Sequence, residues 1–461
     1  MKSIIESSYF YNIWEQIRSR PLAYDTITTT FFAMIGKGVS FLVPLFIAAW
    51  FGITSETDAF FFSYGLILFL AGIFAPVIES VIVPYIAEAR GNNEDVGRFV
   101  GNVLGMSGVA LVIVVVIFLF IIQPVLSIVT HFNTKSLQLI SLLFIETAPL
   151  IILLSCSSVL TGTLNAYKKF AIPAISPVLR ATITIIIIVA LKGILGIHAI
   201  VWGYLIGESF RLIMIFGAIY RFNLYSITFS LKLDEKLKEF LKTISFQIAG
   251  MTIIGLNPIV DKAMASWLGH GSVSVIYYAD RLYMIPVVFV STGLMVTILS
   301  HWSDRYYAQG SQHLNNDITR IAKPTMIVTL TLMFVLILLH QPIVNFAFGR
   351  GAFDDTKLAE VGWVWFCYLL GFAPYVMSQI LNRRLLVLKR TKLLFMLSCL
   401  WVSMNIILNI VLMHVLNVAG IALATTVVYT LASIILLGLF KKDMNHNEAT
   451  GVPIQVKSDV L

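Results

Sequence analysis

Charged residues are scarce in this sequence. Asp, Glu, Lys and Arg make up 12% of the 461 residues, whereas hydrophobic residues make up 58%, and the mean hydropathy is +0.89. A water-soluble domain carries about 25% charged residues, because polar groups must cover its surface. A soluble enzyme or binding module is therefore excluded, and we expect an integral membrane protein.

Cysteines and catalytic motifs are also scarce. The three cysteines, Cys156, Cys367 and Cys399, lie in apolar runs without a CxxC spacing, which excludes a disulfide framework or a cysteine metal site. The eight histidines form no ligand cluster. The sequence has no phosphate-binding loop, GxSxG, HExxH or dinucleotide fingerprint. We expect no catalytic residue, no metal and no cofactor, so an ion gradient, the membrane potential or another protein must supply any energy.

Long apolar runs account for most of the chain. A helix of about 20 apolar residues crosses the roughly 30 Å hydrocarbon core of a membrane, and twelve such runs follow one another with short polar loops between them. The predicted spans are 29–50, 60–83, 100–126, 138–160, 172–191, 197–219, 243–267, 273–299, 324–346, 359–381, 393–415 and 418–440. This pattern predicts an all-α integral membrane protein.

Lysine and arginine are distributed unevenly over the loops. Of these residues, 23 fall on the side of the membrane that holds both termini, and 4 fall on the opposite side. Basic residues mark the cytoplasmic side, so residues 1–28 are predicted to be a cytoplasmic or interfacial segment and residues 441–461 a cytoplasmic tail. The basic excess flanks the membrane, where it meets anionic lipid headgroups, so we expect membrane lipids and no nucleic acid as partners.

One segment of the chain is repeated. Residues 48–64 and 265–281 align without a gap at an offset of 217, which places Gly52 on Gly269. Six predicted spans separate the two copies, so both halves enter the membrane in the same direction. Parallel repeats are common in transporters, in which one half rocks against the other.

The repeat predicts two lobes of six helices. The most polar internal stretch lies between them, which places the boundary near residue 232. We therefore expect an N-terminal lobe over 29–231 and a C-terminal lobe over 232–440.

Several ionisable residues fall inside or near the ends of the predicted spans. They are Lys37, Asp58, Glu79, Glu146, Arg180, Glu208, Arg211, Asp261, Lys262, Asp280 and Arg281. A charge at the bilayer centre costs at least about 2.5–3.5 kcal/mol, so it usually faces a cavity or a partner.

Structural roles compete with functional ones for most of these residues. Thr57 or Asp58 can cap the helix that begins there, and Glu208 can pair with Arg211 three residues later. Arg180 and Lys262 can extend to the membrane surface.

Lys37 and Arg281 favour a cavity-facing role, and two cations in a cavity imply an anionic ligand. Glu79, Asp58, Asp261, Lys262 and Asp280 are candidates for lining the cavity or for gating. Because neighbouring helical residues point about 100° apart, Asp280 is expected to contact the adjacent helix 243–267 or the other lobe rather than Arg281.

Five segments of the sequence resemble one family. AWFGITSETDAFF, IVPYIAEARG, LNAYKKFAIPAISPVL, SVSVIYYADRLYMIP and FGRGAFDDTKL are similar to segments of the lipid II flippases of the MurJ/MviN type. This family belongs to the superfamily of multidrug, oligosaccharidyl-lipid and polysaccharide exporters. The resemblance implies two six-helix lobes that form a V around a central cationic cavity. It also implies that the protein flips a sugar linked to undecaprenyl pyrophosphate to the outer leaflet.

Arg281 matches the cavity arginine of the family, and Lys37 falls where the family has a first-helix arginine. Other cavity positions differ, because Val43, Pro44 and Ala71 stand where the family has two further arginines and an acid. The family also usually has two more spans than the twelve predicted here. These differences favour a repeat unit of a surface polysaccharide or O-antigen type as the cargo, moved across the bacterial cytoplasmic membrane by alternating access.

Three alternative functions remain at this point. They are lipid II flipping for peptidoglycan synthesis, cation-coupled drug export, and a non-transporting scaffold for a glycan-assembly complex. The favoured prediction includes a polysaccharide polymerase or glycosyltransferases as partners.

Overall fold

The computed structural model describes residues 21–228, 235–388 and 390–450, and within these ranges the chain is helical and has no strand. The helices of the first half are α2 (Pro21–Phe51), α3 (Ser55–Gly91), α4 (Val96–Val129), α5 (Thr134–Thr147), α6 (Pro149–Ala166), α7 (Ala171–Leu195) and α8 (His198–Arg221). Those of the second half are α9 (Glu235–Gly255), α10 (Asn257–Ala265), the 3₁₀ helix η1 (Ser266–Leu268), α11 (Ser272–Leu338), α12 (His340–Phe348), α13 (Asp355–Leu370), α14 (Phe372–Val387), α15 (Thr391–Leu416) and α16 (Val418–Thr450). The predicted all-α membrane fold is confirmed.

The predicted count of twelve spans is not confirmed. Among the described residues, nine helices are long and apolar enough to cross a membrane, or ten if α13 and α14, which are bent by 41° at their junction, form one broken span. The predicted span 243–267 is divided between α9 and α10 at Leu256.

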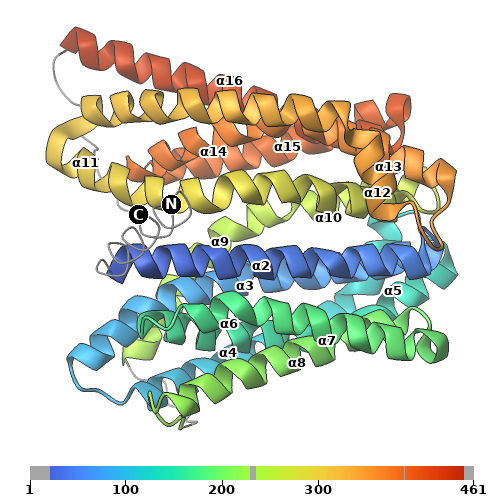
Figure 1. The fold of residues 1–461 in the computed structure, drawn as a ribbon, viewed down its shortest axis with the longest axis horizontal. Helices are drawn as coiled ribbons and strands as arrows, with labels where there is room; N and C mark the ends of the chain where they lie inside the picture. Colours follow the sequence, from blue (N-terminus) through green and yellow to red (C-terminus); the bar gives the residue numbers. More distant parts are fainter. Residues whose placement is uncertain (1–20, 229–234, 389, 451–461) are drawn as a thin grey trace, which may run out of the picture. The chain divides into compact units, whose positions relative to one another are not determined.

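The predicted spans 273–299 and 324–346 are joined by helix. Both begin in α11, which is 67 residues long and bends back on itself in Figure 1. The polar stretch between them continues the helix instead of forming a loop.

The chain divides into two compact units. Unit 1 contains residues 1–46, 70–121 and 142–248, and unit 2 contains residues 47–69, 122–141 and 249–461. In unit 1, α7 and α8 pack along each other. In unit 2, α11 packs against α13, α14 and α16, and Tyr283 of α11 stacks on Tyr368 of α13 with ring centroids 5.6 Å apart.

The boundary expected near residue 232 lies outside the described residues, so the lobes 29–231 and 232–440 stay a prediction. Most of the segment 1–28 also lies outside them, except that residues 21–28 belong to α2. Of the tail 441–461, the structure describes residues 441–450, which belong to α16.

The two copies of the repeated segment have the same local geometry in unit 2. Gly52 and Gly269 both have positive φ, +62° and +104°, a region that glycine adopts without steric cost. The helices that follow begin at Ser55 and Ser272.

Residues 217 apart also contact each other in this unit. The hydroxyls of Thr57 and Ser274 lie 3.0 Å apart, and the rings of Phe61 and Tyr278 meet edge to face at 5.2 Å. Contacts between equivalent positions are typical of elements beside a two-fold axis, which agrees with a parallel repeat.

Candidate functional site

Four charged residues gather in unit 2. Asp261 and Lys262 come from α10, and Asp280 and Arg281 come from α11. Lys262 lies close enough to the other three for their charges to interact, and Asp280 also interacts with Asp261. We call these residues the α10–α11 quartet. Two opposite pairs of charges are thus brought together by helices that are neighbours in the sequence.

The aromatic ring of Tyr277 lies between the two cations of the quartet. The guanidinium carbon of Arg281 lies 4.8 Å from the ring centroid, and Nζ of Lys262 lies 5.7 Å from it. Phe61 of α3 stacks on Tyr277 at 3.8 Å with an interplanar angle of 14°. Distances below about 6 Å allow cation–π attraction, so one ring positions both cations.

Lys262 also reaches the backbone of α3. Its Nζ donates to the carbonyl oxygen of Phe61 at 3.4 Å. A Cβ at Gly65 would stand 2.5 Å from that Nζ and 3.2 Å from Cδ of the same lysine. The absence of a side chain at Gly65 therefore makes room for Lys262, which lies half-buried here.

Asp261 is held in a buried polar network. It is 7% exposed and accepts a hydrogen bond from the side-chain amide of Asn409 at 2.8 Å. The same amide donates to Asn405 at 3.2 Å, and Asn405 donates to the Thr425 hydroxyl at 3.4 Å. These three residues were missed from the sequence because they carry no charge. Two asparagines four residues apart in an apolar run, on one helical face, were the available signal.

Asp58 caps a helix other than its own. Its carboxylate accepts from the N–H groups of Gly271 at 2.5 Å and Ser274 at 2.7 Å, and from the Ser274 hydroxyl at 2.6 Å. The start of α3 is capped instead by Thr54 and Thr57, each of which accepts from the other's N–H. Asp58 thus neutralises the positive N-terminal end of α11.

Unit 1 contains a separate charge cluster on α7 and α8. Glu208 is fully buried and pairs with Arg211 at 3.0 Å and with Arg180 at 3.5 Å. Arg211 also donates from Nε to the Ser176 hydroxyl at 3.0 Å. The pairing of Glu208 with Arg211 that the spacing predicts is therefore present.

Glu79 and Lys37 also lie in unit 1. The side-chain amide of Asn165 donates to Glu79 at 3.4 Å, and Arg211 is near enough to attract the Glu79 carboxylate. Lys37 is exposed on α2, beside Gly36, where a Cβ would be 3.1 Å from the Ala174 carbonyl oxygen of α7.

Of the predicted site residues, the structure brings Asp261, Lys262, Asp280 and Arg281 together, while Lys37 and Glu79 belong to unit 1 and Asp58 is placed at the start of α11.

Comparison with known proteins identifies the family. The model of the family "Lipid II flippase MurJ" matches residues 47–461. The chain belongs to this family. A probable lipid II flippase MurJ of Buchnera aphidicola is 24% identical over 413 residues, which cover 87% of this chain and 80% of that protein.

Solved structures agree on the fold. A MurJ structure in an inward closed conformation has a TM-score of 0.76 and 24% identity, and the match covers 90% of this chain and 87% of that one. An inward-facing multidrug resistance MATE transporter of the MOP superfamily has a TM-score of 0.72 and 15% identity, with coverage of 92% and 96%. The expected family is confirmed. The chain is a transporter of the bacterial inner membrane and not an enzyme.

The cargo predicted from the sequence is wrong. The expected surface-polysaccharide or O-antigen-type unit rested on Val43, Pro44 and Ala71, which stand where the MurJ pattern has charged residues, and on the number of spans. The match to MurJ extends over residues 47–461, and it overturns that prediction. Single cavity residues can change while the packing that defines a family persists, so three positions were too few to decide the cargo.

Proposed function

We propose that the chain flips lipid II across the inner membrane for peptidoglycan synthesis. The observation that carries this proposal is the arrangement of Arg281 and Lys262 about Tyr277 in a chain of the MurJ family. Two neighbouring cations suit the pyrophosphate of a lipid-linked sugar, because arginine meets two phosphate oxygens with a planar fork and lysine adds a compact charge.

Lys37 is proposed as a further cation that meets the anionic cargo. It stands in unit 1, where the family pattern has an arginine, and its side chain is exposed on α2. The lobes over 29–231 and 232–440 are proposed to rock against each other and to present the site to each side in turn.

The acids of the quartet are proposed to hold the cations until the cargo arrives. Asp280 interacts with both Lys262 and Arg281, so a pyrophosphate that draws these cations away also releases Asp280. Asp261 keeps its hydrogen bond to Asn409.

The variant Asp280→Asn tests the role of Asp280 as a gate. If Asp280 only makes a static hydrogen bond, the amide can replace it and flipping continues. If the gate depends on the charge of Asp280, the variant loses flipping. Spin-label distances between the lobes, with and without lipid II, should shift in this variant, and unchanged distances with normal flipping would refute the gate.

The function is tested in proteoliposomes that contain fluorescent lipid II on one leaflet. We expect flipping well above that of vesicles without protein, and none of a surface-polysaccharide unit linked to the same lipid. Equal flipping of both cargoes, or of the polysaccharide unit alone, would contradict the proposal.

Both termini and the segment 221–242 are proposed to face the cytoplasm, on the strength of the loop charge bias. Lys238 is suited to a labelling test because half of its side chain is exposed. Lys238→Cys should react with an impermeant maleimide only after the membrane is opened, and reaction from outside intact cells would reverse the topology. Glycosyltransferases are proposed as partners.

A further inference from the structure

Unit 2 contains a cavity that the function proposed above does not use. It has a volume of about 200 Å³ and is lined by residues from the start of α3, the α4–α5 loop and the η1–α11 loop. The loop charge bias places these segments on the side away from the cytoplasm. Pockets for drug-sized ligands measure about 300–1,000 Å³, so this cavity suits a single ring-sized group.

The helix N-termini around the cavity are already capped from within the protein. Asp58 accepts the N–H groups of Gly271 and Ser274, and Asn133 accepts the N–H of Ser136 at 2.8 Å. An anion would find these donors occupied and would face the carboxylate of Asp58. The cavity therefore disfavours an anionic ligand.

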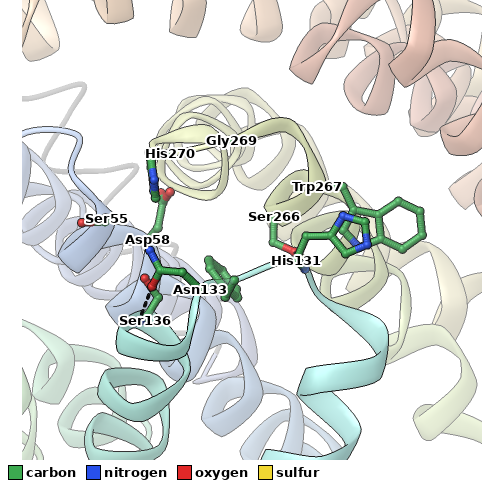
Figure 2. A pocket seen from close by; sticks show the side chains of 10 residues that line it. Ser55, Asp58, His131, Asn133, Ser136, Ser266, Trp267, Gly269 and His270 are labelled. Carbon is green, nitrogen blue, oxygen red and sulfur yellow. Dashed lines mark hydrogen bonds between the residues drawn. The ribbon is translucent and has the colours of Figure 1, made fainter.

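One wall of the cavity is aromatic. Trp267 and His131 stack with centroids 5.1 Å apart, and Figure 2 shows them together on one side of the cavity. The indole N–H of Trp267 donates to the Val129 carbonyl at 2.9 Å, and 38% of the residue is exposed. The indole is thus fixed in place while part of its surface stays open to a ligand.

The opposite wall is polar. Asp58, Asn133, Ser136 and His270 lie there in Figure 2. Ser136 is 7% exposed and lines the cavity. A serine hydroxyl at a cavity wall can donate a hydrogen bond to a ligand and accept one from it.

We propose that this cavity binds one uncharged sugar ring. Aromatic surface on one side, and the Asp58 carboxylate with hydroxyl, amide and imidazole groups on the other, match the apolar faces and the hydroxyl edge of a pyranose. The inference rests on the proposed function, since the cargo of that function carries a sugar headgroup. The cavity is then a subsite for the sugar on the outer side of the membrane, apart from the cations at Tyr277.

The test is binding of N-acetylglucosamine to the full chain in nanodiscs, followed by saturation-transfer NMR. We expect saturable binding with a Kd in the millimolar range. Ser136→Ala should weaken it about three- to tenfold, which corresponds to one lost hydrogen bond, and Trp267→Ala should abolish it. Trp363→Ala is the matched control, because Trp363 is also exposed in unit 2 but stacks on Phe366 outside the cavity.

Absence of saturable binding to the unsubstituted protein would overturn the proposal, as would equal binding by Ser136→Ala and the control. Binding of inorganic pyrophosphate that Ser136→Ala weakens would also overturn it, because the cavity would then be an anion site. Thermal unfolding of each variant verifies that it is folded. The sugar measurement involves no flipping, so lipid II flipping without sugar binding would refute this inference and leave the proposed function standing.

Discussion

In unit 1, Glu208 contacts Arg211 at 3.0 Å and Arg180 at 3.5 Å, whereas in unit 2 the contacts of Lys262 are a backbone carbonyl and the ring of Tyr277. Both clusters lie within helices of a membrane protein and both contain acids as well as bases. They differ in what each charge touches. A buried carboxylate pairs directly with arginines in one, whereas in the other the lysine contacts a neutral ring and a carbonyl and the acids of the quartet lie nearby.

This difference separates a structural cluster from one suited to binding. A direct buried ion pair is costly to break, because removing one partner leaves an uncompensated charge. Cation–π contacts contribute about 0.5–2 kcal/mol, so a pyrophosphate can replace them at small cost. We therefore expect substitutions in unit 1 to change stability, and substitutions around Tyr277 to change flipping.

The largest expected effect is that of Arg281→Ala on flipping. Truncating one partner of a buried, charged hydrogen bond costs about 2–5 kcal/mol, so initial rates of lipid II flipping in proteoliposomes should fall at least about 30-fold. Arg281→Lys should keep part of the activity, since it retains the charge but loses the planar fork. A folded Arg281→Ala protein with normal flipping would remove this residue from the site.

Glu208→Gln should lower the free energy of unfolding by about 2 kcal/mol, because it weakens a charged hydrogen bond to Arg211 and removes the ion pair with Arg180. Flipping per folded molecule should stay close to that of the unsubstituted protein. Glu146→Gln is the control, since Glu146 pairs with His198 at 2.7 Å but both are partly exposed, and its cost should stay below about 1 kcal/mol. Denaturant unfolding in detergent gives both values, and equal losses would erase the contrast between the units.

Gly65→Ala should displace Lys262, because the new methyl group would meet Nζ at 2.5 Å. The flexible end of the lysine can move away, so stability should change by less than about 1 kcal/mol while flipping falls about three- to tenfold. Gly72→Ala on the same helix is the control, since nothing lies within 4 Å of the Cβ position there. Equal flipping by the two variants would show that the position of Lys262 does not matter.

The smallest effect is expected at Lys236, which donates to Glu94 at 2.7 Å and to Glu88 at 3.3 Å. The hydrogen bond from Lys236 lowers the pKa of the Glu94 carboxyl from its ordinary value of 4.5. A carboxyl whose folded pKa is depressed stabilises the fold above its unfolded pKa and loses that effect as the pH falls through the folded pKa. At pH 7 the Lys236→Met variant should therefore have a slightly lower melting temperature than the unsubstituted protein. At a pH below the pKa of Glu94 in the folded protein, the two melting temperatures should be equal. A difference in melting temperature that does not change with pH would contradict this.

Much of the membrane architecture could be predicted from the sequence. Hydropathy and loop charge are local properties, and each apolar run must satisfy its backbone hydrogen bonds within a helix once it is in lipid. The exact count of twelve spans is not confirmed, since the polar stretch after residue 300 continues α11 as helix, and the predicted cargo was wrong. Neither the break at Leu256 nor the continuation of α11 as one helix of 67 residues has a distinct hydropathy signal.

The sequence by itself determined that the chain crosses a membrane as helices, that it repeats a segment 217 residues apart and that it carries charges where they are costly. Only the tertiary structure decided what those charges touch. Asp58 caps a helix more than 200 residues away, Asp261 is held by asparagines of α15, and Lys262 fits against a glycine of α3. The physical reason is that neutral partners such as amides, carbonyls, rings and glycines become specific only when the fold brings a charge into contact with them.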